Sequence, residues 1–234
     1  MHQLSVIIPI LNEANTIGKL LRHLTNNAAS QKHIAGIIVV DGGSTDGSQK
    51  VVSAFSSVQL ITSQKSRARQ MNTGASVATG NILYFLHADS IPPKHFDKHI
   101  INEVKKGNEA GCFKMKFDSP HWWLKLAGWL TQFPWRACRG GDQSQFITKT
   151  LFNTIGGYNE SYTIYEDNDL INKLYARKQF VVIQEWLITS ARCYHTNGIW
   201  RLQYHYWTIY LKKWLGASPD TLNQYYLKYI RVEK

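Results

Sequence analysis

The sequence is poor in cysteine, in charged residues and in long apolar runs. Its three cysteines are widely spaced and form no C-x-x-C pair, which argues against a disulfide framework or a cysteine-bound zinc site and favours a reducing, cytoplasmic compartment. No window reaches the roughly 18 uninterrupted apolar residues of a transmembrane helix, and the run Leu4–Leu11 is too short for a span or a signal peptide. With 44% hydrophobic and 18% charged residues, the chain is not a disordered one. We therefore expect a folded protein that is soluble or peripherally attached to a membrane.

Acidic residues are also scarce, because 27 Lys and Arg stand against 16 Asp and Glu, which gives a net charge of +11. Such a surplus attracts phosphate groups on a nucleic acid, an anionic lipid or a nucleotide. The sequence has no nucleic-acid-binding motif and its positive charges are scattered, so we expect no nucleic-acid partner. A nucleotide- or nucleic-acid-binding module without catalysis, peripheral to a membrane, is the alternative to an enzyme.

Short β-branched runs alternate with helical patterns over the first hundred residues. Strands are expected at Leu4–Ile10, Ile34–Val40, Val58–Thr62 and Asn81–Leu86, and helices at Thr16–Leu24, Ser48–Phe55 and Arg67–Ala78. Repeated β-α-β units with short connections predict an α/β fold with a mostly parallel, doubly wound sheet. No repeat, linker or charge run marks a boundary, so residues 1–234 are predicted to form one domain.

Tryptophan is absent from the first half of the chain, since all eight lie between Trp122 and Trp214. Two stretches, 121–135 and 200–215, carry apolar residues at helical spacing: Trp122, Leu126, Trp129 and Phe133 in the first, and Trp200, Tyr204, Trp207, Leu211 and Trp214 in the second. Such stripes usually pack in a core, and we expect packing here. Because Arg201 and Lys212 lie on a neighbouring face, peripheral membrane contact, or stacking on a sugar or lipid acceptor, is the alternative.

Three acidic residues follow predicted strands, at the edge where open α/β sheets bind ligands. Glu13 could hold a ribose hydroxyl, but it is equally explained by the start of the next helix. Asp41 begins DGGSTDGS, whose glycines allow a close approach to a ligand and whose Ser, Thr and Asp residues are typical helix caps. Asp89 could bind Mg²⁺ or Mn²⁺ together with phosphate oxygens, or it could merely begin a turn.

A further acidic pair, Glu166 and Asp167, opens a predicted helix whose apolar stripe continues at Leu170, Ile171 and Leu174. Acids in a first helical turn are favoured by the helix dipole alone. The functional interpretation makes one of them a general base that reaches an acceptor hydroxyl. The sequence pattern leaves both open.

Five segments occur in a fixed order: SVIIPILNE, VVDGGSTDGS, HAD after a strand, RGGDQSQFI and YEDNDL. In this order they resemble family 2 glycosyltransferases of the GT-A fold. RARQMNTGA at Arg67–Ala75 and GASP at Gly216–Pro219 are similar to the small soluble bacterial branch of that family. The resemblance runs from Ser5 to about Tyr226. It implies inverting transfer of a sugar from a nucleotide-diphosphate sugar, most commonly a UDP-sugar, to an acceptor hydroxyl.

The resemblance also implies roles for single residues. Those that would bind the nucleotide sugar are Pro9, Leu11, Glu13, Asp41, Arg69 and Ala88. Asp89 matches the last acid of the D-x-D motif, which holds a divalent cation, Mn²⁺ or Mg²⁺, between the phosphates. Asp167, with Glu166 beside it, matches the base that deprotonates the acceptor, and Asp142 matches a position in the acceptor-side loop. Residues 1–90 would then form the nucleotide-binding half, and residues 91–234, with C-terminal helices from about residue 200, would receive a lipid or glycan acceptor at the inner face of the membrane.

The sequence departs from the family pattern at His87, which replaces the first acid of D-x-D and leaves the expected metal site one carboxylate short. A transferase that binds nucleotide but has lost turnover is therefore a further alternative. The Q-x-x-R-W motif of processive synthases is absent, which argues against polymer extrusion. A sugar nucleotidylyltransferase would carry a glycine-rich loop after the first strand, whereas PILNE has no glycine there.

Overall fold

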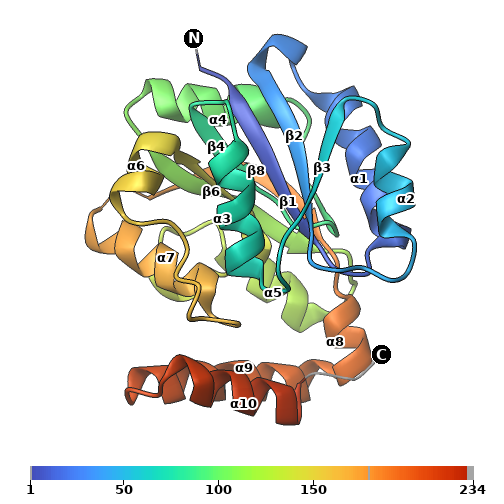
Figure 1. The fold of residues 1–234 in the computed structure, drawn as a ribbon. Helices are drawn as coiled ribbons and strands as arrows, with labels where there is room; N and C mark the ends of the chain where they lie inside the picture. Colours follow the sequence, from blue (N-terminus) through green and yellow to red (C-terminus); the bar gives the residue numbers. More distant parts are fainter. Residues whose placement is uncertain (1, 179, 231–234) are drawn as a thin grey trace.

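The computed structural model describes residues 2–178 and 180–230, and its centre is one eight-stranded sheet of order β3-β2-β1-β4-β7-β6-β8-β5 (Figure 1). The strands are β1 Leu4–Ile10, β2 Ile34–Asp41, β3 Val58–Thr62, β4 Ile82–Phe85, β5 Ser90–Ile91, β6 Ala110–Phe117, β7 Gln145–Thr148 and β8 Val181–Thr189. β1 pairs in parallel with β2 and β4, and β2 with β3, whereas β7 is antiparallel to both of its neighbours. The predicted α/β class and mostly parallel sheet are confirmed.

The helices cover both faces and one edge of this sheet. They are α1 Ala14–Asn27, α2 Ser48–Ser53, α3 Arg67–Val77, α4 Phe96–Lys105, α5 Trp122–Leu130, α6 Lys149–Thr154, α7 Glu166–Ala176, α8 Arg192–Asn197, α9 Ile199–Trp214 and α10 Pro219–Tyr229. All the elements that the sequence predicts in the first hundred residues are present, and none of their ends differs from the prediction by more than three residues. None of the helices within residues 2–178 and 180–230 has the length and apolarity needed to cross a membrane.

Two apolar cores lie on opposite faces of the sheet, because side chains alternate along each strand. Val6 and Ile8 face the core shared with α1, α2 and α4, while Ile7 between them faces α3, α6 and α7. The second core is tight at Gly74 of α3, where a Cβ atom would lie 2.5 Å from the Cγ2 atom of Ile7. Glycine at this position therefore sets how closely α3 approaches β1.

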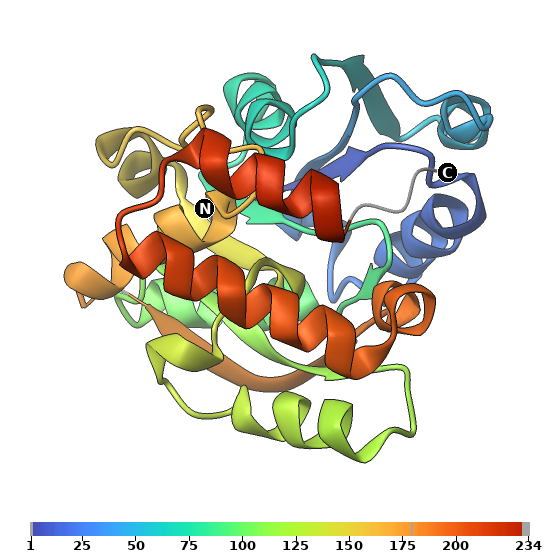
Figure 2. The same cartoon turned by 90° about the horizontal axis from the view of Figure 1, so that it is seen from below.

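A third, smaller core joins α9 and α10, which pack side by side below the carboxyl ends of β1 and β2 (Figures 1 and 2). Its buried residues are Tyr162, Leu202, Ile209, Leu222 and Ile230. These two helices thus form a separate layer across the edge at which α/β sheets bind ligands.

The structure corrects the expectation that the two aromatic stripes pack in a core. On α9 the inward face carries Leu202 and Ile209, so the stripe from Trp200 to Trp214 points the other way and is exposed. On α5 the side chains of Trp122, Leu126 and Trp129 are exposed as well. The helix there ends at Leu130 rather than reaching Trp135, four residues before Pro134. Periodicity identifies an apolar face but does not determine which side of the helix meets the protein.

Candidate functional site

The carboxyl ends of β1 and β2 lie together, with Ile10 paired to Asp41, and their loops are tied by side chains. The Asn12 side chain accepts a hydrogen bond from the Thr45 amide at 2.8 Å, and Ser44 Oγ accepts one from the Asn12 amide at 2.9 Å. Asp46 Oδ2 accepts one from the Ala14 amide at 2.9 Å. Much of the polar content of DGGSTDGS therefore organises the neighbouring loop, although Asp46 also accepts from the Ser48 amide at the start of α2.

Asp41 is fully buried at the tip of β2, and its carboxylate is occupied by groups of its own loop. Ser44 donates to it from the hydroxyl at 2.5 Å and from the amide at 3.1 Å, and the Gln49 side chain donates at 2.6 Å. Buried Gln70 braces the same edge by donating to the carbonyls of Ile10 and Val40 at 2.8 and 2.7 Å. This side of the site is a rigid platform with satisfied hydrogen bonds.

Across the edge lies a cluster of one cation and three acids, made by Arg67 at the start of α3, Asp142, and Glu166 and Asp167 at the start of α7. Desolvation opposes the charge of Arg67, but Glu166, Asp167 and Asp142 outweigh it and raise the pKa of the guanidinium. For Asp142, desolvation raises the pKa, Asp89 and Asp167 add to this, and His87 and Arg67 act against it. Because Arg67 and Asp142 keep access to solvent, the cluster borders a wet cleft rather than a closed core.

Glu166 and Asp167 differ although they are adjacent in the sequence. Glu166 is only 2% exposed, and its Oε1 atom has no hydrogen-bond partner among the described residues. Burial, and then the charge of Asp167, raise the pKa of Glu166 to about 8. Glu166 is therefore mainly protonated at neutral pH.

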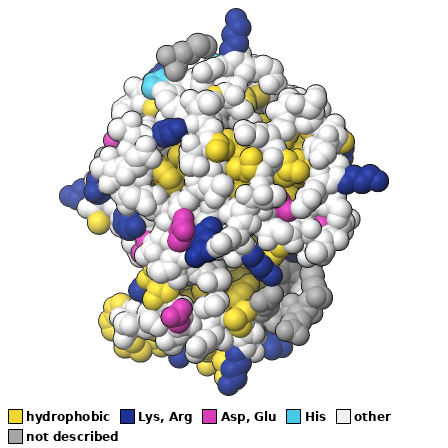
Figure 3. All heavy atoms as spheres, viewed as in Figure 1, with side chains coloured by type: hydrophobic (Ala, Val, Ile, Leu, Met, Phe, Trp, Pro, Cys, Tyr) yellow, Lys and Arg dark blue, Asp and Glu magenta, His cyan; other side chains and the backbone are white. Residues whose placement is uncertain are grey.

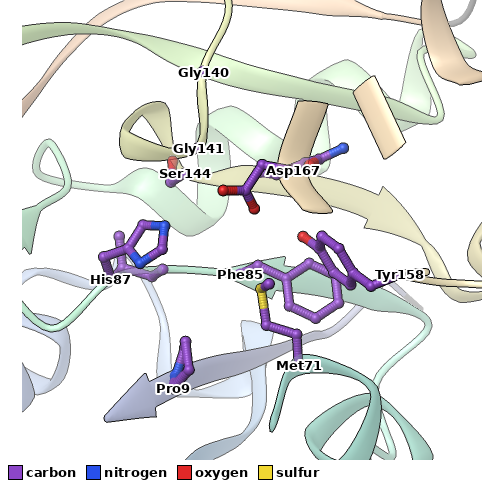
Figure 4. A pocket seen from close by; sticks show the side chains of 11 residues that line it. Pro9, Met71, Phe85, His87, Gly140, Gly141, Ser144, Tyr158 and Asp167 are labelled. Atoms are coloured by element: carbon purple, nitrogen blue, oxygen red, sulfur yellow. The ribbon is translucent and has the colours of Figure 1, made fainter. Parts of the chain in front are cut away.

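Asp167 faces a small pocket together with His87, Tyr158 and Met71, as Figure 4 shows. The cavity volume is about 10 Å³, which is room for one water-sized group. The carboxylate lies directly against Gly141, where a Cβ atom would come within 1.8 Å of its Oδ2 atom. Only glycine at position 141 permits this placement of Asp167.

Asp89 follows β4 and is bound by Arg192, the first residue of α8, with 3.2 Å between Oδ2 and Nε. The same guanidinium donates to the Glu13 carboxylate, with 2.8 Å from its NH1 group to Oε2 and a second bond to Oε1. Arg192 therefore joins two residues that the sequence assigned to the donor site. No motif pointed to it, because it lies 179 positions from Glu13.

The residues around Asp89 fit a divalent cation only in part. Among the described residues, no three His, Cys, Asp or Glu side chains are placed to hold a metal. Mg²⁺ bound with a nucleotide takes one or two protein carboxylates and fills its other positions with phosphate oxygens and water. Asp89 fits as that single ligand, on condition that Arg192 gives up its ion pair.

The remaining predicted residues lie around this edge, with one exception. Pro9 lines the pocket, Leu11 is half-buried just past β1, and Ala88 is buried beside Asp89. Arg69 instead lies on the surface, with its Nε atom 3.5 Å from Glu160. The sequence reasoning passed over Arg67, which sits two positions earlier within the same RARQ motif and faces the acids.

The layer formed by α9 and α10 lies below the carboxyl ends of the strands and so next to the site (Figures 1 and 2). Tyr210 of α9 donates to the Asn168 side chain at 3.4 Å and contacts the ring of Tyr165. Burial raises the pKa of Tyr206 well above its usual value, and the charge of Asp142 contributes. The phenol rings of the layer thus lie close to the acids on the far side of the cleft.

Parts of the chain are similar in sequence to known glycosyltransferases. The family model described as "Glycosyl transferase family 2" matches residues 5–160. "Glycosyltransferase AglE" of Haloferax volcanii is 34% identical over 94 residues, which are 38% of this chain and 31% of that protein. "Undecaprenyl-phosphate 4-deoxy-4-formamido-L-arabinose transferase" of Pseudomonas fluorescens is 25% identical over 114 residues, 46% of this chain and 34% of that protein. The matches thus span about a third of these relatives.

Among solved structures, residues 1–349 of S. aureus TarS have a similar fold. The TM-score is 0.64 at 17% identity, and the match covers 82% of this chain and 61% of that one. TarS has also been crystallised with UDP and with UDP-GlcNAc, and these structures have the same TM-score. At this level of identity the likeness concerns the fold.

Proposed function

Because this chain belongs to glycosyl transferase family 2 and is a glycosyltransferase, we propose that it transfers a sugar from a nucleotide-diphosphate sugar to an acceptor hydroxyl with inversion at the anomeric carbon. The observation that carries the proposal is the placement of Asp167, an acid held against Gly141 in a pocket at the carboxyl edge of the sheet.

The donor would lie along the platform made by the ends of β1, β2 and β4. Pro9, Leu11, Glu13, Asp41 and Ala88 line or border this edge, and TarS, the structural neighbour, binds UDP and UDP-GlcNAc. We therefore propose a UDP-sugar as the donor and residues 1–90 as the donor-binding half. Arg67 and Arg192 place positive charge near the edge, where a diphosphate leaving group develops negative charge.

In the transfer step, an acceptor oxygen forms a bond to the anomeric carbon while the bond from that carbon to the diphosphate breaks. The electron pair of the broken bond leaves with the nucleoside diphosphate, and Asp167 takes the hydroxyl proton. Glu166, protonated at neutral pH, does not compete for that proton and lowers the negative charge beside Asp167. A divalent cation, Mn²⁺ or Mg²⁺, held by Asp89 and the donor phosphates would neutralise charge on the leaving group.

The acceptor would approach through residues 91–234, with Asp142 at the mouth of the cleft. Acceptor lipids are suggested by the relative from Pseudomonas fluorescens, whose name describes an undecaprenyl-phosphate transferase. A glycan acceptor fits the aromatic side chains equally well, because sugars stack on such rings.

Cys112, Cys138 and Cys193 are free thiols, which supports the expected cytoplasmic location.

The first experiment measures thermal melting with UDP, GDP and dTDP, each with and without Mn²⁺. A bound nucleotide at about 100 times its Kd adds about 2.7 kcal/mol to stability, so a shift with one base identifies the donor class. Absence of a shift with every nucleotide would contradict the donor site.

The second experiment compares Asp167→Asn with Asp169→Asn on the same helix, whose carboxylate pairs with Lys173 outside the pocket. Nucleotide release from the donor sugar should fall by about 10²–10⁴-fold in the first variant only, while nucleotide binding is kept. Full activity of Asp167→Asn would reject it as the base. NMR of the product anomer tests inversion directly.

A further inference from the structure

The exposed side of α9 is unusually apolar for a surface helix. Its outward stripe includes Trp200, Tyr204, Trp207, Leu211 and Trp214. Trp214 is 81% exposed. The opposite face of the helix, at Leu202 and Ile209, is the one that packs on α10. The stripe therefore contributes little to the core and leaves a large apolar area in water, which marks an interaction surface.

This stripe continues onto α5, so that two helices distant in sequence form one surface. The ring centroid of Trp200 lies 5.8 Å from that of Trp122 and 5.3 Å from that of Trp123, and Trp123 lies 6.1 Å from Trp207. Trp122 is itself 60% exposed. We call this surface the aromatic face, defined by Trp122, Trp123, Trp200, Tyr204, Trp207, Leu211 and Trp214. α5 and α9 run beside one another in the view from below (Figure 2).

Charge around the aromatic face has one sign. Residues 119–141 and 186–219, which contain α5, α8 and α9, include no Asp or Glu. Lys125 and Arg201 are exposed beside the rings, whereas Lys212 and Lys213 turn away from them toward Tyr225 and Tyr162. On the side of the lower layer that Figure 3 shows, which is the side of α10, an acidic side chain lies among the apolar and basic ones. Tryptophan and tyrosine flanked by Lys and Arg match the chemistry of an anionic lipid surface, where rings enter the headgroup region and cations meet phosphates.

We propose that the aromatic face binds the surface of an anionic lipid bilayer, with α9 lying in the plane of the interface. The charge pattern favours lipid over a second copy of the chain. In a two-fold dimer through this face, Lys125 and Arg201 would meet the same cations of the other copy, and residues 119–141 and 186–219 contain no acid to neutralise them. An anionic bilayer supplies the missing negative charge.

The position of the face has a consequence that rests on the proposed function. Because α9 and α10 also cover the carboxyl edge of the sheet, a bilayer bound there would lie next to the cleft that contains Asp142 and Asp167. An acceptor anchored in the lipid could then reach the site without leaving the membrane. Binding to vesicles needs neither donor nor turnover, so failure of the surface and failure of the transferase assignment give separate results.

The experiment is flotation of the full chain with vesicles of phosphatidylcholine, with and without phosphatidylglycerol. Binding is expected with the anionic vesicles, together with a blue shift of tryptophan emission, and it should weaken as salt rises. The double variant Leu211→Gln with Trp214→Gln should bind about tenfold less, because two apolar side chains no longer enter the interface. Both side chains are more than half exposed, so the fold is expected to persist.

Two further variants that change the net charge equally test the proposal without the double variant. Arg201→Glu and Lys98→Glu change the net charge equally, but Lys98 is exposed on α4, at the opposite end of the molecule (Figure 1). Only Arg201→Glu should lose binding. Equal loss in both would mean that total charge and not this face acts, and absence of binding to anionic vesicles at low salt would overturn the proposal. Dimers that disappear in the Leu211→Gln, Trp214→Gln variant, without vesicle binding, would instead assign the face to self-association.

Discussion

The two sides of the cleft differ in how their polar groups are satisfied. On the donor side, Asp41 is buried but accepts three hydrogen bonds from Ser44 and Gln49, and Gln70 bridges two strand ends. On the opposite side, Glu166 is almost as deeply buried, lies next to another carboxylate, and has an oxygen without a hydrogen-bond partner in the part of the chain that the structure describes. The carboxylate on the donor side is thus stabilised by hydrogen bonds, whereas the carboxylates on the opposite side destabilise one another's charged forms.

This difference teaches where chemistry can be expected. Strongly shifted pKa values concentrate at functional sites, because catalytic acids and bases need pKa values that differ from those of the same groups in water. A carboxylate with all its hydrogen bonds made, such as that of Asp41, holds its loop in place. The pKa values of the acids around Arg67 depend on one another's charge, so a ligand bound among them would change those values. The comparison makes opposite predictions for substitutions on the two sides.

The largest effect is expected at Gly141, because the position of the Asp167 carboxylate requires a residue without a side chain there. Gly141→Ala places a Cβ atom 1.8 Å from the Asp167 carboxylate, so the carboxylate must move. A displacement of about 1 Å in a reacting group costs on the order of 100-fold in rate. Gly140→Ala is the control, because a Cβ atom there meets nothing within 4 Å. If both variants keep full nucleotide release, the position of Asp167 is not critical.

Glu166→Gln should change the pH dependence of stability. The pKa of Glu166 is about 8 in the folded protein against 4.5 as its ordinary value, so the folded state binds the extra proton between these values. The stabilisation from this group is therefore complete below pH 4.5 and is lost as the pH rises to about 8. The wild type should lose about 1 kcal/mol per pH unit relative to Glu166→Gln in this window. Parallel curves of unfolding free energy against pH would show that Glu166 is ionised like an ordinary acid.

Asp41→Asn should lower the stability of the protein by weakening the donor side. The amide nitrogen of Asn cannot accept from Ser44 or Gln49, so at least one of the buried donors loses its partner, at a cost of about 1–2 kcal/mol. The measurement is chemical denaturation, followed by UDP binding at a temperature where the variant is folded. Weakened UDP binding with unchanged stability would instead make Asp41 a direct ligand of the nucleotide and not a brace.

Much of the donor side could be predicted from the sequence, because it depends on local pattern. Apolar strands that end in Asp41 or Asp89 follow the general rule for parallel sheets, and the acids of YEDNDL do begin a helix at Glu166. The family pattern adds the order of these segments. What binds and reacts there stays a prediction for each residue.

The remaining contacts of both sides could not be predicted, because they join segments that are distant in the sequence. Arg192 meets Glu13 across 179 positions, and Asp167 meets Gly141 only after α7 packs on the sheet. The aromatic stripes show the same limit. Both faces of α9 are apolar, so periodicity cannot say that Leu202 turns inward and Trp207 outward.

Arg192 joins Glu13 and Asp89 on the donor side, and its removal gives the smallest predicted effect. The guanidinium pairs with Asp89, the single carboxylate available to a cation, so Arg192→Gln should free that ligand. A partly exposed ion pair contributes about 0.2–1 kcal/mol, so Mn²⁺ binding without nucleotide should tighten by only about twofold to fivefold. Titration calorimetry or Mn²⁺ electron paramagnetic resonance measures this without any turnover.

Asp89→Asn is the control and should abolish the binding in both backgrounds. If Mn²⁺ binds Arg192→Gln more weakly than the wild type, the guanidinium supports the cation site instead of competing with it. The donor side would then be organised by Arg192 as firmly as by Ser44 and Gln49.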